Sequence, residues 1–329
     1  MASNIHSNEG INDIFDLCEN IHDEQKANIL VFIAHHIKNP QFIEATQLAL
    51  ITALDKQEPV TLKRDDKYYI LLDQLCDSLK KEIVEPDKVI DPEKEREEML
   101  RRMDDSEKLM PKEKVNPNDL PIEIQNMNKS LRSIEVVGQI VRNRQGSLPK
   151  TNIKALVIQM YETAFRTISY FGTIVEADRA QMIDDIIRNK KEGISNEEIK
   201  KKLDMFFEIT SLNFCLFVFS KIINSVGAKE LRATFSEIAE EIGTPAAKLV
   251  SFSIITSFSK LAIEDLKKLV EELKDNHVAM SIIRARVRSY LYNNHVSFSD
   301  RQRIIQAVNL SPRDSKITTN RQLKRFKRS

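Results

Sequence analysis

The sequence predicts an all-α protein, built as a helical array or bundle in two sections. Apolar residues recur at i, i+3, i+4 and i+7 along most of the 329 residues, which is the spacing of amphipathic helices. No segment shows the apolar–polar alternation of a half-buried strand. The chain holds only 7 Gly and 10 Pro, too few for a β-sandwich with frequent turns or for a collagen repeat. Hydrophobic residues make up 41%, which is enough for a core.

Residues 1–85 are expected to form the first section, with four helices. Helical spacing of apolar residues predicts the first helix around 11–18. Asp23 is placed to cap a second helix, which ends before a proline. A third helix is expected over 42–51, and Thr61 is placed to cap the fourth.

Residues 86–120 are predicted to be a charged, proline-containing linker. Residues 85–123 hold five of the ten prolines, and their 13 acidic and 8 basic residues give a net charge of −5. Opposite charges four residues apart allow a solvated helix over 93–109. We therefore divide the chain into the first section, this linker, a helical domain over 121–312 and a basic tail over 313–329.

The helical domain shows helix-boundary signals in regular succession. Pro121 suits the first turn of a helix, and Gly146–Pro149 interrupts the helical pattern. An S-x-x-E capping box begins at Ser195. Gly227 stands where a glycine just beyond a helix end is expected.

The later part of this domain continues the pattern. Residues 243–245, Gly-Thr-Pro, predict the end of one helix and the cap and first residue of the next. Ser299 is placed to cap a last short helix that stops before Pro312. The most apolar stretch, Ile209–Ile223, is about 15 residues long, whereas a membrane span needs about 20. We therefore predict that it lies in a central core helix.

Cysteine usage and the N-terminus predict a cytoplasmic protein. The three cysteines, Cys18, Cys76 and Cys215, are widely spaced and form no C-x-x-C pair. Neither a disulfide framework nor a zinc site is expected from them. The first ten residues, MASNIHSNEG, lack the basic and apolar regions of a secretory signal.

Sequence motifs for cofactor chemistry are also missing. The chain contains neither the G-x-x-x-x-G-K-[ST] nor the G-x-G-x-x-G phosphate-binding pattern. His35 and His36 are adjacent, so on a helix their side chains point about 100° apart and do not share one metal. We expect no cofactor and no metal.

The charge of the chain is divided unevenly. The formal net charge of +1 is the sum of −9 over residues 1–283 and +10 from Arg284 onward. The basic residues chosen as a candidate binding surface lie in one predicted helix and in the tail. They are Arg284, Arg286, Arg288, Arg321, Lys324, Arg325, Lys327 and Arg328. With Phe326 they would suit nucleic-acid phosphates and a base; an acidic protein partner or a solvated tail are the other interpretations.

One pair of residues suggests catalysis. Arg288 and His295 match the R-x(4–6)-H pattern of HEPN-type ribonucleases, in which an Arg holds phosphate and a His performs acid–base chemistry. Seven residues are about two helical turns, which would place both on one face. About one match is expected by chance, so coincidence is the other interpretation. Ser289 stands where that pattern has Asn, and His295 falls near the predicted end of the helix.

Five segments resemble parts of one family. They are LRSIEVVGQIVRNRQGSLP (131–149), NSVGAKELRATF (224–235), YLYNNHVSFSDRQRI (290–304), FIAHHIKNP (32–40) and QEPVTL (57–62). Together they resemble the C-terminal α-helical, sensor-like region of bacterial STAND-type NTPases of antiviral defence, over most of residues 25–310. The effector and ATPase parts of those proteins have no counterpart here, and no catalytic residue carries over. The resemblance implies a detached sensor-like module.

The sequence therefore predicts a non-enzymatic interaction module in bacterial antiphage defence that binds a partner protein or a phage component. Two alternatives stay open: a HEPN-like ribonuclease using Arg288 and His295, and a nucleic-acid-binding module using the basic helix and tail. Nothing in the sequence predicts the oligomeric state.

Overall fold

The computed structural model describes residues 8–36, 43, 46–48, 53–73, 120–189 and 195–310. Within these ranges the regular elements are helices, and none is a strand, so the predicted all-α fold class is confirmed. Residues 86–119 of the predicted linker and the predicted tail 313–329 lie outside the described residues, as does most of the helix predicted over 42–51.

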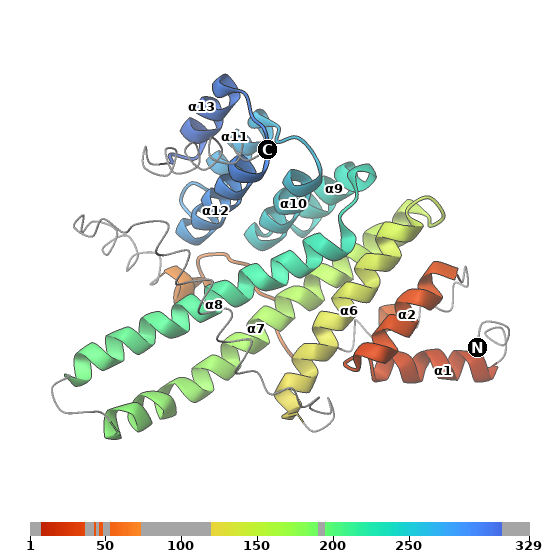
Figure 1. Cartoon of the computed structure of the whole chain (residues 1–329), viewed down its shortest axis with the longest axis horizontal. Helices are drawn as coiled ribbons and strands as arrows, with labels where there is room; N and C mark the ends of the chain where they lie inside the picture. Colours follow the sequence, from red (N-terminus) through yellow and green to blue (C-terminus); the bar gives the residue numbers. More distant parts are fainter. Residues whose placement is uncertain are drawn as a thin grey trace, which may run out of the picture.

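Three long helices form the centre of the molecule (Figure 1). They are α6 (Ile122–Arg144), α7 (Lys150–Arg188) and α8 (Asn196–Val226). Each packs against the other two, and the break predicted at Gly146–Pro149 is the turn between α6 and α7. Two N-terminal helices flank this bundle. These are α1 (Asn8–Glu19) and α2 (Glu24–His36); α2 packs on α6, and α1 packs on α2.

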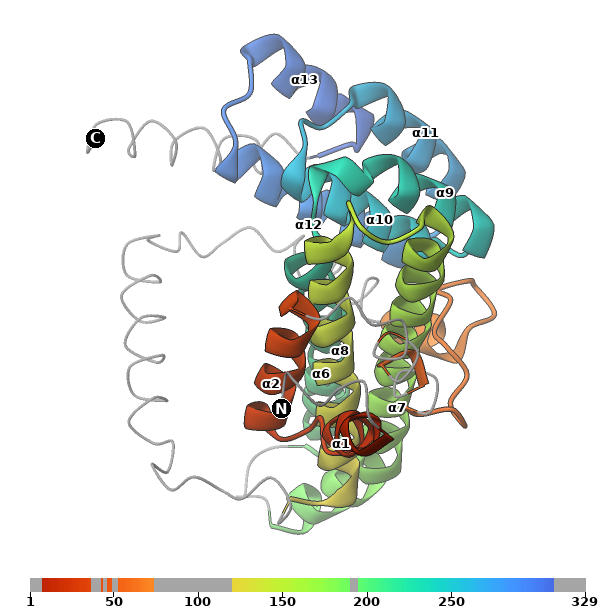
Figure 2. The same cartoon turned by 90° about the vertical axis from the view of Figure 1, so that its right-hand side faces the viewer.

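A layer of shorter helices covers one end of the bundle (Figure 2). It consists of the 3₁₀ turn η2 (Lys229–Leu231) and of α9 (Arg232–Ile242), α10 (Pro245–Phe258), α11 (Ile263–Leu273), α12 (His277–Asn293) and α13 (Phe298–Ala307). In this C-terminal layer α9 packs on α10, α10 on α12, and α11 on α13. Contacts of α10 with α8 and of α9 with α7 attach the layer to the bundle.

α8 is a central helix and contains the long apolar stretch Ile209–Ile223. By length and composition it is the one helix of the described residues that could cross a membrane. Its C-terminal half is instead a core helix, as predicted, because Cys215, Phe219 and Ile222 are fully buried between α6, α7 and α10. Burial raises the pKa of the Cys215 thiol to about 12, so this cysteine behaves as a small apolar residue.

The two predicted sections share one core. Leu30 and Leu72 from the first section belong to the same hydrophobic cluster as Ile134, Phe165 and Phe219 from the second. A short amphipathic helix cannot bury its apolar face alone, so α1 and α2 gain their burial from α6. The boundary drawn in the sequence is therefore not a boundary between separate cores.

Residues 57–73, which we call the strap, connect elements that are distant in the sequence. The N–H of Val60 donates to the carbonyl of Phe165 in α7 (3.2 Å), and the N–H of Ala246 in α10 donates to the carbonyl of Thr61 (3.0 Å). The amide of Asn276, which caps α12, donates to the carbonyl of Leu62 (2.7 Å). The strap therefore fixes α7, α10 and α12 relative to one another.

Asp66 organises the strap and corrects one prediction. The helix that starts at residue 67 is capped by Asp66, whose Oδ1 accepts from the N–H of Tyr68 (2.8 Å). Its Oδ2 accepts from the N–H groups of Thr61 (2.5 Å) and Leu62 (3.0 Å). The prediction that Thr61 caps this helix is wrong, because Thr61 lies five residues before Asp66 and is bound by the Asp66 carboxylate. The helix starts later because Asp66 satisfies donors on both sides of the turn.

Other helix ends are confirmed or shifted. Asp23 accepts from the N–H of Gln25 at the start of α2 (2.7 Å), and Ser195 accepts from the N–H of Glu198 (3.1 Å). Gly243 adopts the left-handed conformation (φ +64°) that the 243–245 signal predicts. The prediction that Ser299 caps the last helix is wrong. Ser297 caps α13 instead, because its hydroxyl accepts from the N–H of Asp300 (3.1 Å).

Gly227 ends α8 for a reason other than the predicted one. Its φ is −57°, which any residue can adopt, so no left-handed backbone is involved. A Cβ at this position would lie 1.8 Å from the ring of Phe258, the last residue of α10. Glycine is required here because α8 and α10 approach closely.

We expect Gly227→Ala to lower the free energy of unfolding by roughly 2–3 kcal/mol, because Phe258 must move. Urea unfolding measures the change. Gly146→Ala is the matched control, because a Cβ there meets nothing within 4 Å, and it should stay within about 0.5 kcal/mol of wild type. Equal effects of the two changes would contradict this explanation.

Asp66→Ala should lower the free energy of unfolding by about 2–3 kcal/mol, because it removes a helix cap and leaves half-buried N–H groups unpaired. The neighbouring Asp65 is exposed, so Asp65→Ala serves as the control and should be nearly neutral. Chemical denaturation of both variants tests the difference. A small effect of Asp66→Ala would show that the strap does not depend on this carboxylate.

Candidate binding groove

Two adjoining cavities form a groove in the C-terminal layer. They lie where the α10–α11 loop, residues 259–262, faces the α12–α13 loop, residues 294–297. Four residues, Lys260, Tyr290, Val296 and Asp300, line both cavities, so the two adjoin. We call them together the C-terminal groove.

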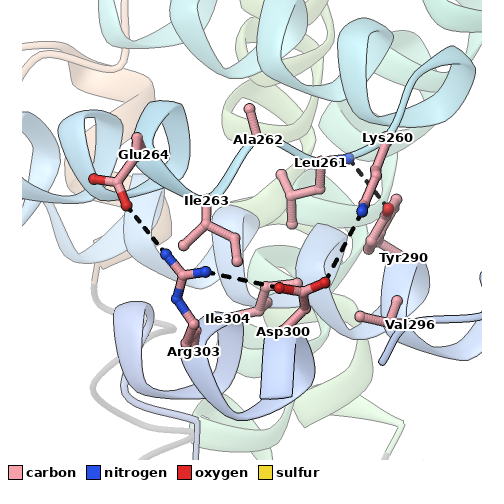
Figure 3. Close-up of a pocket in the computed structure, with 10 residues that line it drawn as sticks. All are labelled: Lys260, Leu261, Ala262, Ile263, Glu264, Tyr290, Val296, Asp300, Arg303 and Ile304. Carbon is pink, nitrogen blue, oxygen red and sulfur yellow. Dashed lines mark hydrogen bonds and ion pairs between the residues drawn. The ribbon is translucent and has the colours of Figure 1, made fainter. Parts of the chain in front are cut away.

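The smaller cavity, of about 270 Å³, has apolar walls (Figure 3). Leu261, Ile263, Val296 and Ile304 provide these walls. The hydroxyl of Tyr290 accepts a hydrogen bond from the N–H of Leu261 (3.1 Å), which joins the α10–α11 loop to α12. This buried bond holds one wall of the cavity in place.

Charged side chains alternate along the rim of the smaller cavity. Figure 3 shows Arg303 between Glu264 (3.4 Å) and Asp300 (3.7 Å), and Lys260 beside Asp300 (3.9 Å). These pairs are partly exposed, so each contributes little to stability. They matter for binding instead, because a polar group of a ligand would meet both positive and negative charges around the apolar cavity.

The larger cavity, of about 680 Å³, is polar and more basic. Lys229, Lys260 and His295 line it together with hydroxyl-bearing residues and a single carboxylate, Asp300. The ammonium of Lys229 has no carboxylate of the described residues within ion-pair distance. This end of the groove therefore suits an anionic group, whereas the smaller cavity suits an apolar one.

The structure separates the three arginines predicted in one helix. All three lie in α12, but the Nε of Arg284 donates to the carbonyl of Val308 (3.1 Å). Arg286 turns toward Cys215 of α8, where burial lowers its pKa, and its Nε has no hydrogen-bond partner among the described residues. Arg288 is exposed. Arg286 points away from Arg284 and Arg288, because residues two apart on a helix point in nearly opposite directions, so the three do not form one basic face.

The other predicted basic residues, Arg321, Lys324, Arg325, Lys327 and Arg328, lie outside the described residues. Within the described part of the chain, no group of three or more His, Cys, Asp or Glu side chains is placed to hold a metal ion.

Arg288 and His295 do not share a helix face, which corrects the prediction made from their spacing. α12 ends at Asn293, and Asn294 is extended, so His295 lies in the following loop. His295 lines the larger cavity, whereas Arg288 lines neither cavity of the groove.

Sequence reasoning missed most of the groove. Its walls come from two loops about 35 residues apart and from the helices beside them. The sequence shows only that the helical pattern is interrupted near Ser259 and near Ser297. The sequence did contain a helix-start signal at the second interruption, because Ser297 and Asp300 have the spacing of a capping box.

Comparison of the chain with protein-family models, with curated proteins and with solved structures found no match.

We expect the purified chain to leave single-stranded RNA intact and His295→Ala to behave as wild type, because His295 lies in the loop beyond α12 and not on the helix face that the ribonuclease pattern requires. Gel analysis of labelled RNA incubated with both proteins tests this. Cleavage by the wild type that His295→Ala abolishes would establish the ribonuclease alternative instead.

Proposed function

We propose that this protein is a non-enzymatic interaction module that binds a short segment of a partner protein in the C-terminal groove. The observation that carries the proposal is that an apolar cavity adjoins a basic one. Most peptide-binding sites combine a pocket for an apolar side chain with polar groups that fix orientation.

The groove favours a segment with an apolar side chain beside an acidic residue. The cavity of about 270 Å³ is below the usual range of small-molecule sites, about 300–1,000 Å³, and suits one or two side chains. The acidic residue would face Lys229 and Lys260 in the larger cavity. Charge complementarity of this kind speeds association and selects partners.

The proposed setting is bacterial antiphage defence in the cytoplasm. It is supported by the resemblance of the sequence to the sensor-like helical region of STAND-type NTPases. Such a sensor-like module would act by recognising a phage component, or by holding an effector. Nucleic-acid binding is the second candidate, supported by the basic cavity and by the basic residues of the tail.

The double change Lys229→Glu with Lys260→Glu tests the groove. We expect the wild type to capture one specific protein from infected or uninfected cells, and the double variant to capture at least about tenfold less, because like charges then face the acidic segment. Quantitative mass spectrometry of the captured proteins, after nuclease treatment, measures this.

Lys200→Glu with Lys201→Glu is the matched control, because these exposed lysines make the same charge change at the far end of α8. It should capture as much as the wild type. No specific partner, or equal capture by the groove variant, would contradict the proposal. Loss of capture after nuclease treatment would favour nucleic-acid binding.

A further inference from the structure

The positive charges of the larger cavity belong to lysines. Lys229 comes from η2 and Lys260 from the α10–α11 loop, so two ammonium groups reach the cavity from different elements. Arg303 is the one arginine among the described residues that line the groove, and it lies in the smaller cavity, where it pairs with Glu264 and Asp300 (Figure 3). Arginine holds a planar carboxylate with its two-pronged fork, whereas lysine supplies a point charge that suits phosphate. The cations of the larger cavity are therefore of the kind that binds phosphate.

Hydroxyl groups add hydrogen-bond donors to this cavity. The Ser297 hydroxyl accepts from the N–H of Asp300 (3.1 Å), so its own hydrogen can still be donated to a ligand. The hydroxyl of Ser259 has no partner among the residues that the structure describes, and it too can donate. The Ser257 hydroxyl is different, because it already donates to the carbonyl of Ser253 (2.8 Å). Two hydroxyl donors thus supplement the two ammonium groups.

The single carboxylate of the larger cavity is already paired with cations. One oxygen of Asp300 lies 3.9 Å from the ammonium of Lys260, and the other lies 3.7 Å from the guanidinium of Arg303. The ammonium of Lys229 has no such partner among the described residues. Two lysines against one aspartate leave the lining of the larger cavity positively charged. A ligand with a double negative charge is therefore attracted to this cavity.

We infer that the larger cavity binds a phosphate monoester, carried by a phosphorylated side chain of the partner segment whose apolar side chain enters the smaller cavity. Such a phosphate has a charge of about −2 at neutral pH and three strong acceptor oxygens. The donors come from η2, from the α10–α11 loop and from the α12–α13 loop, so they surround the cavity from three elements. A tetrahedral phosphate accepts from several directions, whereas a carboxylate accepts close to one plane. The partner segment rests on the proposed function, but the affinity of the cavity for phosphate does not.

A nucleic acid fits the same cavity less well. Its affinity comes from several successive phosphates of one charge each, and from bases stacked on aromatic rings. The arginines of α12 do not extend the basic cavity into such a track, because Arg284 is bonded to the carbonyl of Val308 and Arg286 turns toward α8. One strongly charged group beside an apolar pocket matches a phosphorylated segment instead.

Binding of capped dipeptides tests the cavity. The probes combine leucine with phosphothreonine, in both orders, and are compared with the same dipeptides containing glutamate or threonine instead. NMR relaxation of the leucine methyl protons measures each affinity. We expect the phosphorylated dipeptides to bind at least about tenfold more tightly than the glutamate dipeptides, because they carry the larger charge and one more acceptor oxygen. Equal binding of the two, or no binding of either, would overturn the inference.

Lysine substitutions place the binding in the larger cavity. Lys229→Gln with Lys260→Gln should weaken binding of the phosphorylated dipeptides at least about tenfold, because both point charges are lost. Lys200→Gln with Lys201→Gln removes the same charge at the far end of α8 and should leave the affinity unchanged. All four lysines are exposed, and circular dichroism confirms that both variants are folded. Equal binding by the two double variants, or displacement of the dipeptides by a uridine hexamer more readily than by free phosphothreonine, would contradict the assignment.

Capture from cells separates this inference from the proposed function. Treatment of the cell extract with a broad-specificity protein phosphatase should reduce capture of the partner at least about tenfold, because the phosphate that meets the lysines is removed. Capture that survives the phosphatase would overturn the inference and leave the proposed function in place. Binding of the phosphorylated dipeptides without capture of any protein would contradict the proposed function and leave the phosphate site in place.

Discussion

Tyr68, buried between α7 and α8, anchors the strap that helps to hold the C-terminal layer on the bundle. Its hydroxyl donates to the carbonyl of Ser211 in α8 (2.6 Å), and burial keeps the pKa of Tyr68 well above its usual value, so the proton stays on the donor. A Cβ on Gly172 of α7 would lie 3.0 Å from the ring, so the ring packs closely on the backbone of α7. Because Tyr68 is anchored there, Asp66 can hold the turn that reaches α10 and α12. One buried side chain thus fixes a segment that contacts four helices.

This attachment determines where the C-terminal groove lies. The groove is lined largely by loops of the layer, and its shape is set by bonds such as that between Tyr290 and Leu261. Because the strap joins the layer to α7 and α8, the groove has a fixed position relative to the bundle.

The helical boundaries show where sequence patterns are sufficient. Gly243 and the residues after it were predicted correctly, because a left-handed glycine, a cap and a proline act over three adjacent positions. Thr61 and Ser299 were wrong as caps because several polar residues stand close together, and the one that caps is decided by other hydrogen bonds. Gly227 was placed correctly at a helix end but explained wrongly, because its neighbour Phe258 is about 30 residues away.

The sequence by itself determined the all-α class, the break between α6 and α7, and the place of the C-terminal half of α8 as a core helix, which is buried on one side. These follow from side-chain spacing and from backbone preferences, which act within a few residues. Only the tertiary structure decided that both predicted sections share one core, that Arg286 turns inward to α8, and that His295 lies in a groove apart from Arg288. Each of these depends on which surfaces meet across the fold, and no local pattern contains that information.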